Sequence, residues 1–347
     1  MQTRVASSPG IMLALTWKSG PSGPRTRTQT SGALAPENDL IDSWLMHNFV
    51  RTRAARMFFR DNNVSYNEHD ERNRRTGART APKSGLKMSQ RMPALFFGHG
   101  NPMNALLVNP YTEQWAALGR AILRPKAIVC ISAHWYIQDA AVTISTAPKT
   151  IHDFGGFPQQ LYQVQYPAPG DPALAARVQK LLAPLPVRLD ERWGLDHGTW
   201  SVLRHVYPHA DIPVVQLSID ETQPPSFHYE IGKRLAPLRE EGILIVGSGN
   251  VVHNLHAYAW GRRVQEPYDW AISFENRVRE LLLAEEYSPV VDYENQLGRE
   301  ADLAVPTPDH YLPLLYVVGT RTPSEPLTFP VEGVDGGSVS MLAVRVG

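Results

Sequence analysis

Short apolar runs alternate with amphipathic segments from about residue 92 to the end of the chain. The runs are rich in Val, Ile and Phe, as buried strands are, and they lie at 94–97, 127–132, 142–145, 214–219 and 243–247. Apolar residues at helical spacing predict helices over 112–123, 171–185, 199–207, 229–241 and 269–285. A last run predicts a closing strand over 338–346. Strands that alternate with helices predict a single α/β domain in which helices flank a largely parallel central sheet.

Residues 1–90 have a different pattern. They contain clusters of Ser, Thr, Gly, Pro and Arg, such as SGPSGPRTRTQTSG, that cannot bury a core. Within them, the segment 40–59 has the apolar spacing of a short amphipathic helix. We predict that 1–90 is a disordered basic extension, and two alternatives stay open: a targeting segment, or a stretch ahead of a true start at Met88 or Met92. The folded domain is then 91–347.

Charge is divided unevenly along a chain that holds 34 basic and 34 acidic residues. Residues 1–90 hold 14 Lys and Arg against 7 Asp and Glu, and the remainder holds 20 against 27. The acidic body predicts no nucleic-acid partner. No apolar run approaches the roughly 18 residues of a membrane span, so we expect no membrane partner either. The single cysteine, Cys130, excludes an intrachain disulfide and a Cys-rich zinc site, and we expect a cytoplasmic protein.

Three histidines follow three predicted strands. His99 comes after 94–97 between two glycines, His134 comes after 127–132, and His253 comes after 243–247 through GSGN, where Ser248 or Asn250 could cap a helix. Ligands of open α/β sheets gather at the carboxyl ends of the strands, so the three side chains can converge there. Neutral imidazoles are common metal ligands. We predict a metal site at this edge of the sheet.

The alternative is structural, because a single histidine at a strand end is more often a hydrogen-bonded residue. His197, in WGLDHGTW just before a predicted helix, adds a fourth imidazole at the same edge. Glycines beside His99 and His197 give the close backbone approach that a tight site needs. Four histidines together therefore favour the metal site.

Several further residues are weaker candidates for a role in the site. His152 and His310 lie in Gly- or Pro-rich loops, where contact with a substrate and local hydrogen bonding both stay open. Asp196 either orients an imidazole or caps the helix after it, and Asn250 is a candidate partner of ligand or substrate. For His256, on the same predicted helical face as His253, we expect a structural role. The chain lacks the GxGxxG, P-loop and G-x-S-x-G signatures, which excludes common nucleotide-binding and serine-hydrolase sites.

Several long motifs, in order along the chain, closely resemble the 4,5-DOPA dioxygenase extradiol family, of the LigB-type class III extradiol superfamily. They are MPALFFGHGNPMNAL, PKAIVCISAHWY, IHDFGGFPQQLYQVQYPAPGDP, WGLDHGTWSVLRHVYPHADIPVVQLSID and GSGNVVHNL. The resemblance begins near Met92, leaves 1–90 uncovered and makes 91–347 the catalytic domain. It implies that His99, His134 and His253 bind one metal ion, beside which His197 is the catalytic acid/base or a fourth ligand.

The resemblance leaves the metal open between Zn(II) and Fe(II). Bacterial members have been described with zinc, whereas ring cleavage normally needs Fe(II). In the wider superfamily the third ligand is commonly a glutamate, and here that position is His253. Three histidines are also the ligands of the zinc in carbonic anhydrase.

The implied reaction is extradiol opening of a catechol, L-DOPA or a related substituted one, by O2, in a monomer or small homo-oligomer. A zinc hydrolase that uses metal-activated water is one alternative. A catalytically silent binding protein on the same scaffold is another. The presence of His197 argues against the silent protein, which needs no acid/base.

Overall fold

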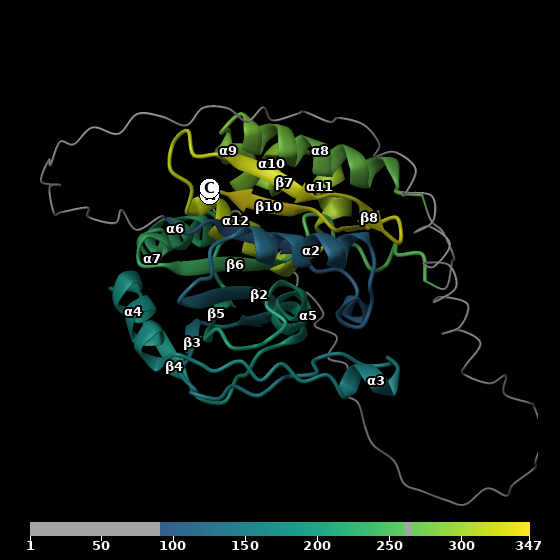
Figure 1. Ribbon diagram of the computed structural model, residues 1–347. Coiled ribbons are helices and arrows are strands. Elements are labelled where there is room, and N and C mark those ends of the chain that lie inside the picture. The colour runs from purple at the N-terminus through teal and green to yellow at the C-terminus, as the bar shows by residue number, and fades with distance from the viewer. Residues whose placement is uncertain (1–90, 261–265) are drawn as a thin grey trace, which may run out of the picture. The chain divides into compact units, whose positions relative to one another are not determined.

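The computed structural model describes residues 91–260 and 266–347, and its centre is a sheet in the strand order β4-β3-β5-β2-β6-β1-β10-β7 (Figure 1). The strands are β1 (Ala94–Gly98), β2 (Ala127–Ile137), β3 (Ala140–Thr143), β4 (Val187–Asp190), β5 (Val214–Asp220), β6 (Ile243–Gly249), β7 (Leu327–Val331) and β10 (Ala343–Val346). A separate pair is formed by β8 (Val334–Asp335) and β9 (Val339–Ser340). The predicted extension 1–90 and the helix at 40–59 lie outside the described residues.

The centre of the sheet is parallel. β5, β2, β6 and β1 pair in parallel. At one side β10 runs antiparallel to both of its neighbours, β1 and β7, and at the other β3 pairs antiparallel with β5. This confirms the predicted α/β fold with a largely parallel sheet. Gly98 of β1 pairs with Gly249 of β6, and Ser132 of β2 pairs with Ser248. The carboxyl ends of β1, β2 and β6 therefore meet at one edge.

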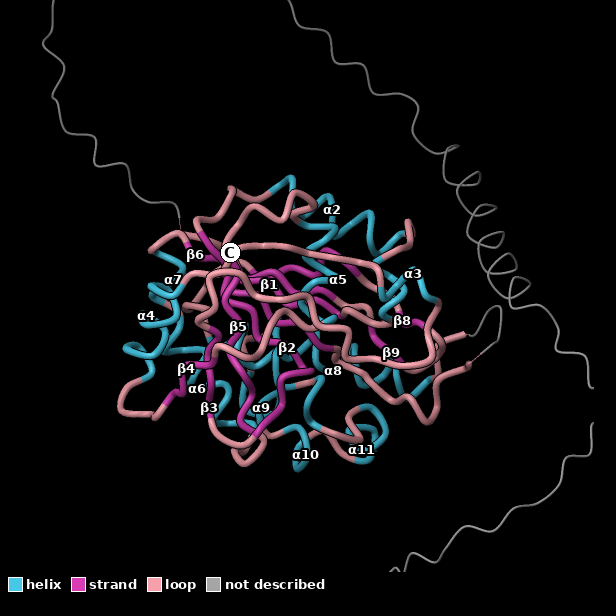
Figure 2. The backbone as a smooth tube through the Cα atoms, turned by 90° about the horizontal axis from the view of Figure 1, so that it is seen from below, coloured by secondary structure: helices cyan, strands magenta, loops and turns pink. Residues whose placement is uncertain are grey.

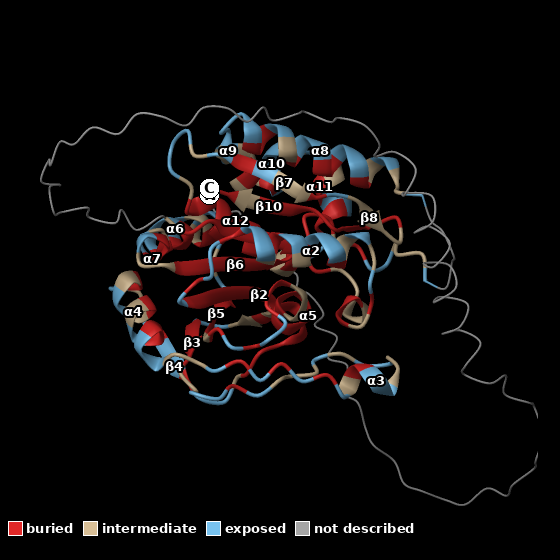
Figure 3. Ribbon diagram, viewed as in Figure 1, coloured by how far each residue is buried: buried red, intermediate tan, exposed pale blue. Residues whose placement is uncertain are grey.

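Helices cover both faces of the sheet (Figures 1 and 2). Alternate residues of β2 divide between two buried clusters: Ile128 and Cys130 pack with α2 and α5, and Val129 and Ile131 pack with α4, α6, α8 and α12. Figure 3 shows the central strands β2, β5 and β6 buried and the outer faces of the long helices exposed. The helices are η2 (Pro102–Ala105), α2 (Pro110–Ala121), α3 (Gln159–Tyr162), α4 (Pro172–Leu182), α5 (His197–Val206), α6 (Pro225–Leu235), α7 (Pro237–Glu240), α8 (Asp269–Leu283), α9 (Tyr287–Val291), α10 (Tyr293–Gln296), α11 (Arg299–Ala304), η3 (Pro308–His310) and α12 (Leu312–Gly319).

Side-chain caps begin three of the predicted helices. Asn109 closes a capping box on α2, and Asp171 and Asp196 each accept a backbone N–H from the first turn of α4 and α5. The predicted helix over 229–241 is instead two helices, because Pro237 has no N–H for the helix bond and begins α7. None of the helices in the described ranges is both long and apolar enough to cross a lipid bilayer.

The predictions were wrong in two places near the carboxyl edge. The run 338–346 is not one strand, because β9 pairs with β8 while β10 joins the main sheet. No helix follows β6 among residues 250–260, so Ser248 and Asn250 cap none and His256 shares no helical face with His253. The backbone N–H groups of Asn250 and His253 donate instead to the carbonyls of His310 and Ala304. Bonds to other segments replace the bonds within a turn that a helix needs.

Candidate metal centre

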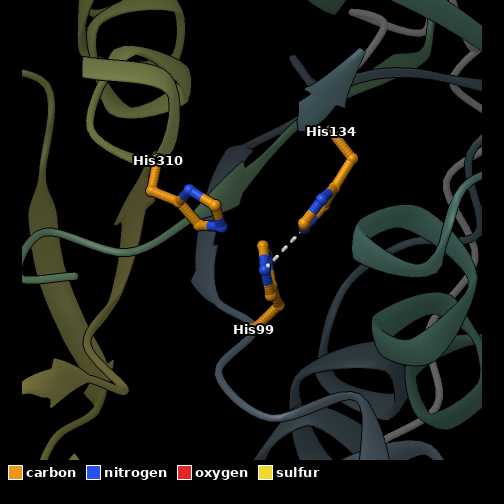
Figure 4. Close-up of side chains that lie close together, drawn as sticks. All are labelled: His99, His134 and His310. Atoms are coloured by element: carbon orange, nitrogen blue, oxygen red, sulfur yellow. Dashed lines mark hydrogen bonds between the residues drawn. The ribbon is translucent and has the colours of Figure 1, made fainter. Parts of the chain in front are cut away.

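Four imidazoles meet at the carboxyl edge of the sheet. His99 follows β1, His134 lies near the end of β2, His197 is the first residue of α5 and His310 ends η3. The ring centroids of His134 and His197 are 3.8 Å apart, and His99 lies 5.0 Å from His134 and 5.3 Å from His310. The sequence prediction that strand-end histidines gather at one point holds for His99 and His134 (Figure 4).

The nitrogens of three of these rings are spaced as metal ligands are. Nε2 of His99 lies 3.1 Å from Nε2 of His134, and one nitrogen from each of His99, His134 and His310 lies within 4.8 Å of the others. Two nitrogens on a tetrahedral ion at the usual Zn–N distance are about 3.3 Å apart. The donor set therefore fits one divalent ion, and Figure 4 shows the three rings facing the same point.

Hydrogen bonds fix which nitrogen of His99 is free. Oγ of Ser248 lies 2.5 Å from the carbonyl oxygen of Gly198 and 3.0 Å from Nδ1 of His99. A carbonyl only accepts, so the hydroxyl donates its one proton there and must accept from His99. Nδ1 of His99 thus carries the hydrogen, and Nε2 presents a lone pair.

The carboxylate of Asp153 lies close to two of the other rings, those of His197 and His134. Oδ2 of Asp153 lies 2.9 Å from Nδ1 of His197 and 3.4 Å from Nδ1 of His134, and Oδ1 accepts the backbone N–H of His197. Asp309 accepts from Nδ1 of His310 in the same way. Carboxylates bound to Nδ1 favour the proton there and leave Nε2 bare, the usual arrangement behind histidine ligands. At His197 and His310 the carboxylate therefore favours the tautomer whose Nε2 carries no hydrogen.

The electrostatics of the cluster favour neutral rings at His99 and His134 and anionic carboxylates at Asp153 and Asp309. Burial, with the neighbouring rings, holds the pKa of both His99 and His134 well below the usual value. Burial alone would raise the pKa of Asp153, but the hydrogen bond and charge of His197 outweigh it and lower that pKa. The same balance, with His310 as the partner, lowers the pKa of Asp309. The 3.1 Å contact between Nε2 of His99 and Nε2 of His134 has room for one hydrogen, which a bound cation would replace.

His253 lies beside this group. Its ring stacks on that of His310, with centroids 3.5 Å apart and an interplanar angle of 7°. Burial, then the charge of His310, lowers the pKa of His253 to about 2. The group of three nitrogens within 4.8 Å contains His310 and does not contain His253, so the structure adds His310 to the ligand candidates, and the ligand role of His253 stays a prediction.

A cavity of about 210 Å³ opens over the imidazoles. The five histidines line it together with the aromatic side chains of Phe154, Phe157, Tyr258 and Trp260. Phe154 meets the ring of His197 edge-on, with centroids 5.5 Å apart. The hydroxyl of Tyr258 donates to Asp335 at 2.7 Å. The site therefore combines ring nitrogens with apolar side chains, as small-molecule sites do.

Three other candidates from the sequence, His152, Asp196 and Asn250, are not among the residues that line the cavity. His152 bonds through Nε2 to the carbonyl of Val164 at 2.9 Å and does not line the cavity, which fits local hydrogen bonding. Asp196 caps α5 and accepts from Ser132 and Gln216, and burial raises the pKa of its carboxyl. Asn250 is buried and donates to the carbonyl of Ser340. These three residues support the site without facing it.

Sequence reasoning missed three partners of the imidazoles: Asp153, Ser248 and Asp309. Two of them directly follow or precede a histidine in sequence, in IHDFGG and PDHY. Adjacency alone does not predict the contact of Asp153, because it reaches His197 across 44 residues. The order Asp-His offers a weak signal for Asp309, whose partner is its neighbour.

The chain is similar to several known proteins. The sequence model of a family described as the catalytic LigB subunit of aromatic ring-opening dioxygenase matches residues 101–321. A 4,5-DOPA dioxygenase extradiol of Escherichia coli K12 is 54% identical over 76% of this chain and 98% of its own length. The enzyme of the same name from Beta vulgaris is 38% identical over 71% of this chain and 92% of its own length. A crystal structure of an uncharacterized E. coli K12 protein matches with a TM-score of 0.66 at 50% identity, covering 74% of this chain and all of that one.

Fold, histidine cluster and relatives together define a metal-dependent aromatic ring-opening enzyme. The chain belongs to the LigB family of dioxygenases and, within it, to the 4,5-DOPA dioxygenase extradiol group. It is an extradiol ring-cleavage dioxygenase that uses a small-molecule substrate and O2.

Proposed function

We propose that the protein opens the ring of a catechol, L-DOPA or a related substituted one, at a single divalent metal ion. His99 and His134 hold the ion, and one member of the stacked pair, His253 or His310, supplies the third ligand. The observation that carries the proposal is the convergence of ring nitrogens, in which Nε2 of His99 lies 3.1 Å from Nε2 of His134. When bound, the ion supplies one centre at which both oxygens of a catechol and, for Fe(II), dioxygen are held and polarised.

His197 is proposed as the acid/base. Its Nδ1 hydrogen is held by Asp153, so Nε2 is free to take the proton of a catechol hydroxyl in the cavity and later to return it. Its ring lies 3.8 Å from that of the proposed ligand His134 and lines the same cavity, which supports a role in proton transfer with a substrate bound there. An imidazole can both accept and donate a proton near neutral pH, and this reaction needs both.

The cavity walls are proposed to position the substrate ring. A volume of about 210 Å³ lies below the roughly 300–1,000 Å³ of sites for drug-sized ligands, which favours a single-ring substrate. Phe154 and Phe157 on one segment, and Tyr258 and Trp260 on another, offer ring faces and edges to an aromatic ligand. The same apolar side chains displace water around the reacting oxygens and strengthen the electrostatic effects there.

Fe(II) is the proposed metal of the ring-opening reaction. The histidine-only donor set also suits Zn(II), and that observation supports zinc-dependent hydrolysis as the second candidate function. To separate the two, the apoprotein is loaded anaerobically with Fe(II) or with Zn(II) and tested in air on catechols and on aryl esters. We expect a yellow ring-opened product from the Fe(II)-loaded protein and none from the Zn(II)-loaded protein. Ester hydrolysis with Zn(II), and no ring opening with Fe(II), would favour the second candidate.

We also propose that the protein works in the reducing cytosol as a monomer or small homo-oligomer. The single cysteine, Cys130, is buried in β2 with a free thiol, and burial raises the pKa of that thiol. Light scattering coupled to gel filtration measures the oligomeric state.

A further inference from the structure

We propose that Ser248 is a positioning residue that fixes the tautomer of His99 and links its ring to the first turn of α5. This inference rests on the proposed metal role of His99. Ser248 is fully buried on β6, where it pairs with Phe97 of β1 on one side and Ser132 of β2 on the other. It therefore lies between the strands that lead into the two ligands His99 and His134.

The Ser248 hydroxyl has a single hydrogen, and the carbonyl of Gly198 at 2.5 Å takes it. The contact of 3.0 Å with His99 then requires an N–H on Nδ1. A neutral imidazole, the form that binds a metal ion, has one ring proton, so with that proton on Nδ1 the Nε2 atom has none. Nε2 is the atom that faces His134.

The short bond to Gly198 depends on a close approach of α5. A Cβ on Gly198 would lie 2.5 Å from Oγ of Ser132 and 2.8 Å from Cδ2 of His134. A glycine therefore lets the first turn of α5 come down onto β2 and β6. Two hydrogen bonds, from His99 to Ser248 and from Ser248 to Gly198, connect a proposed metal ligand to the first turn of α5. Because Gly198 follows His197, this is the backbone that carries the proposed acid/base.

Ser248 differs from the other partners of the cluster. His134, His197 and His310 lie against carboxylates, whereas His99 lies against a neutral hydroxyl. Without that hydroxyl the Nδ1 hydrogen of His99 and the Gly198 carbonyl would both lose a buried partner. The ring would then be free to move its proton to Nε2, the atom that must be bare to bind a metal ion.

The test compares metal affinity in three variants. Ser248→Ala removes the hydroxyl, and Ser248→Thr restores it with a residue that suits a strand. Ser218→Ala is the matched control, because Ser218 is a buried serine on β5 whose hydroxyl accepts from Ala141 and donates to Asp139 away from the cavity. Zn(II) dissociation constants are measured by competition with a chromophoric chelator. We expect a rise of about 10- to 100-fold for Ser248→Ala, with Ser248→Thr and Ser218→Ala close to the wild type.

A second measurement keeps the test decisive if Ser248→Ala does not fold. Long-range ¹⁵N–¹H correlation spectra of the metal-free wild type report which nitrogen of each histidine is protonated, and His99→Gln assigns the His99 signals. We expect Nδ1–H at His99. A folded Ser248→Ala with wild-type zinc affinity, or Nε2–H at His99 in the wild type, overturns the proposal. Failure of the proposed function would appear separately, as tight metal binding with no catechol turnover.

Discussion

Oδ2 of Asp153 lies 2.9 Å from Nδ1 of His197, while Oδ1 of the same carboxylate accepts the backbone N–H of His197 at 2.8 Å. One side chain therefore holds both the position and the proton of the residue proposed as acid/base. The hydrogen bond and charge of His197 outweigh burial and lower the pKa of Asp153, so the carboxylate stays anionic at neutral pH.

Asp153→Asn is expected to lower kcat by about 100-fold or more, the scale of general acid–base catalysis. The amide removes the negative charge and offers an N–H that favours the wrong tautomer of His197. Steady-state oxygen uptake with equal metal content checks this. Asp190→Asn, at a buried carboxylate on the edge strand β4, is the control. Because Asp153 acts through His197, the double variant with His197→Ala is expected to be no slower than His197→Ala alone. Wild-type kcat in Asp153→Asn contradicts this account.

We expect different effects on zinc affinity from replacing the two stacked histidines, His310 and His253. Nε2 of His310 converges with His99 and His134, whereas His253 lies outside the group of three. His310→Ala is therefore expected to weaken zinc binding more than His253→Ala, and by more than the roughly 10- to 100-fold effect of losing an outer partner. Competition with a chelator measures both. The reverse order would give the third ligand position to His253.

Gly198→Ala is expected to destabilise the fold and the metal site together. The added Cβ would approach Oγ of Ser132 and the ring of His134 far within contact distance, and overpacking of this kind costs about 1–3 kcal/mol. Gly155→Ala is the matched control, because a Cβ there meets nothing within 4 Å. Urea unfolding and zinc affinity are measured for both. Equal stability of the two variants would show that α5 can move away from β2 at little cost.

Much of this site follows from the sequence, because strand ends are readable from apolar runs. His99 and His134 terminate such runs, and parallel pairing through β6 brings them together. His253 was placed on an expected helix, but the chain after β6 bonds to the segments around Ala304 and His310 instead. Those long-range bonds, and the approach of the loop carrying Asp153, depend on tertiary packing that no local pattern encodes.

Acid is expected to weaken the fold through a histidine far from the cavity. His228 is fully buried on α6, with Nδ1 2.9 Å from the hydroxyl of Tyr316, and burial lowers its pKa to about 4. The unfolded chain binds this proton near pH 6.5, so stability present above that pH is lost as the pH falls toward the folded value. Between pH 7.5 and pH 5 the loss is about 2 kcal/mol.

Urea unfolding at pH 7.5 and pH 5, in wild type and His228→Gln, isolates this contribution. The variant is expected to be less stable at both pH values but to lose about 2 kcal/mol less on acidification. An identical pH dependence in the two proteins would assign the acid sensitivity to other groups.

The central claim is that this histidine cluster opens catechols with O2, and oxygen uptake by the Fe(II)-loaded protein tests it most directly. With L-DOPA and a panel of substituted catechols in an oxygen electrode, we expect consumption of one O2 for each ring opened. His197→Ala, still loaded with iron, is expected to show uptake lowered by about 100-fold or more. A wild-type protein that binds iron tightly and consumes no oxygen with any catechol of the panel would contradict the account.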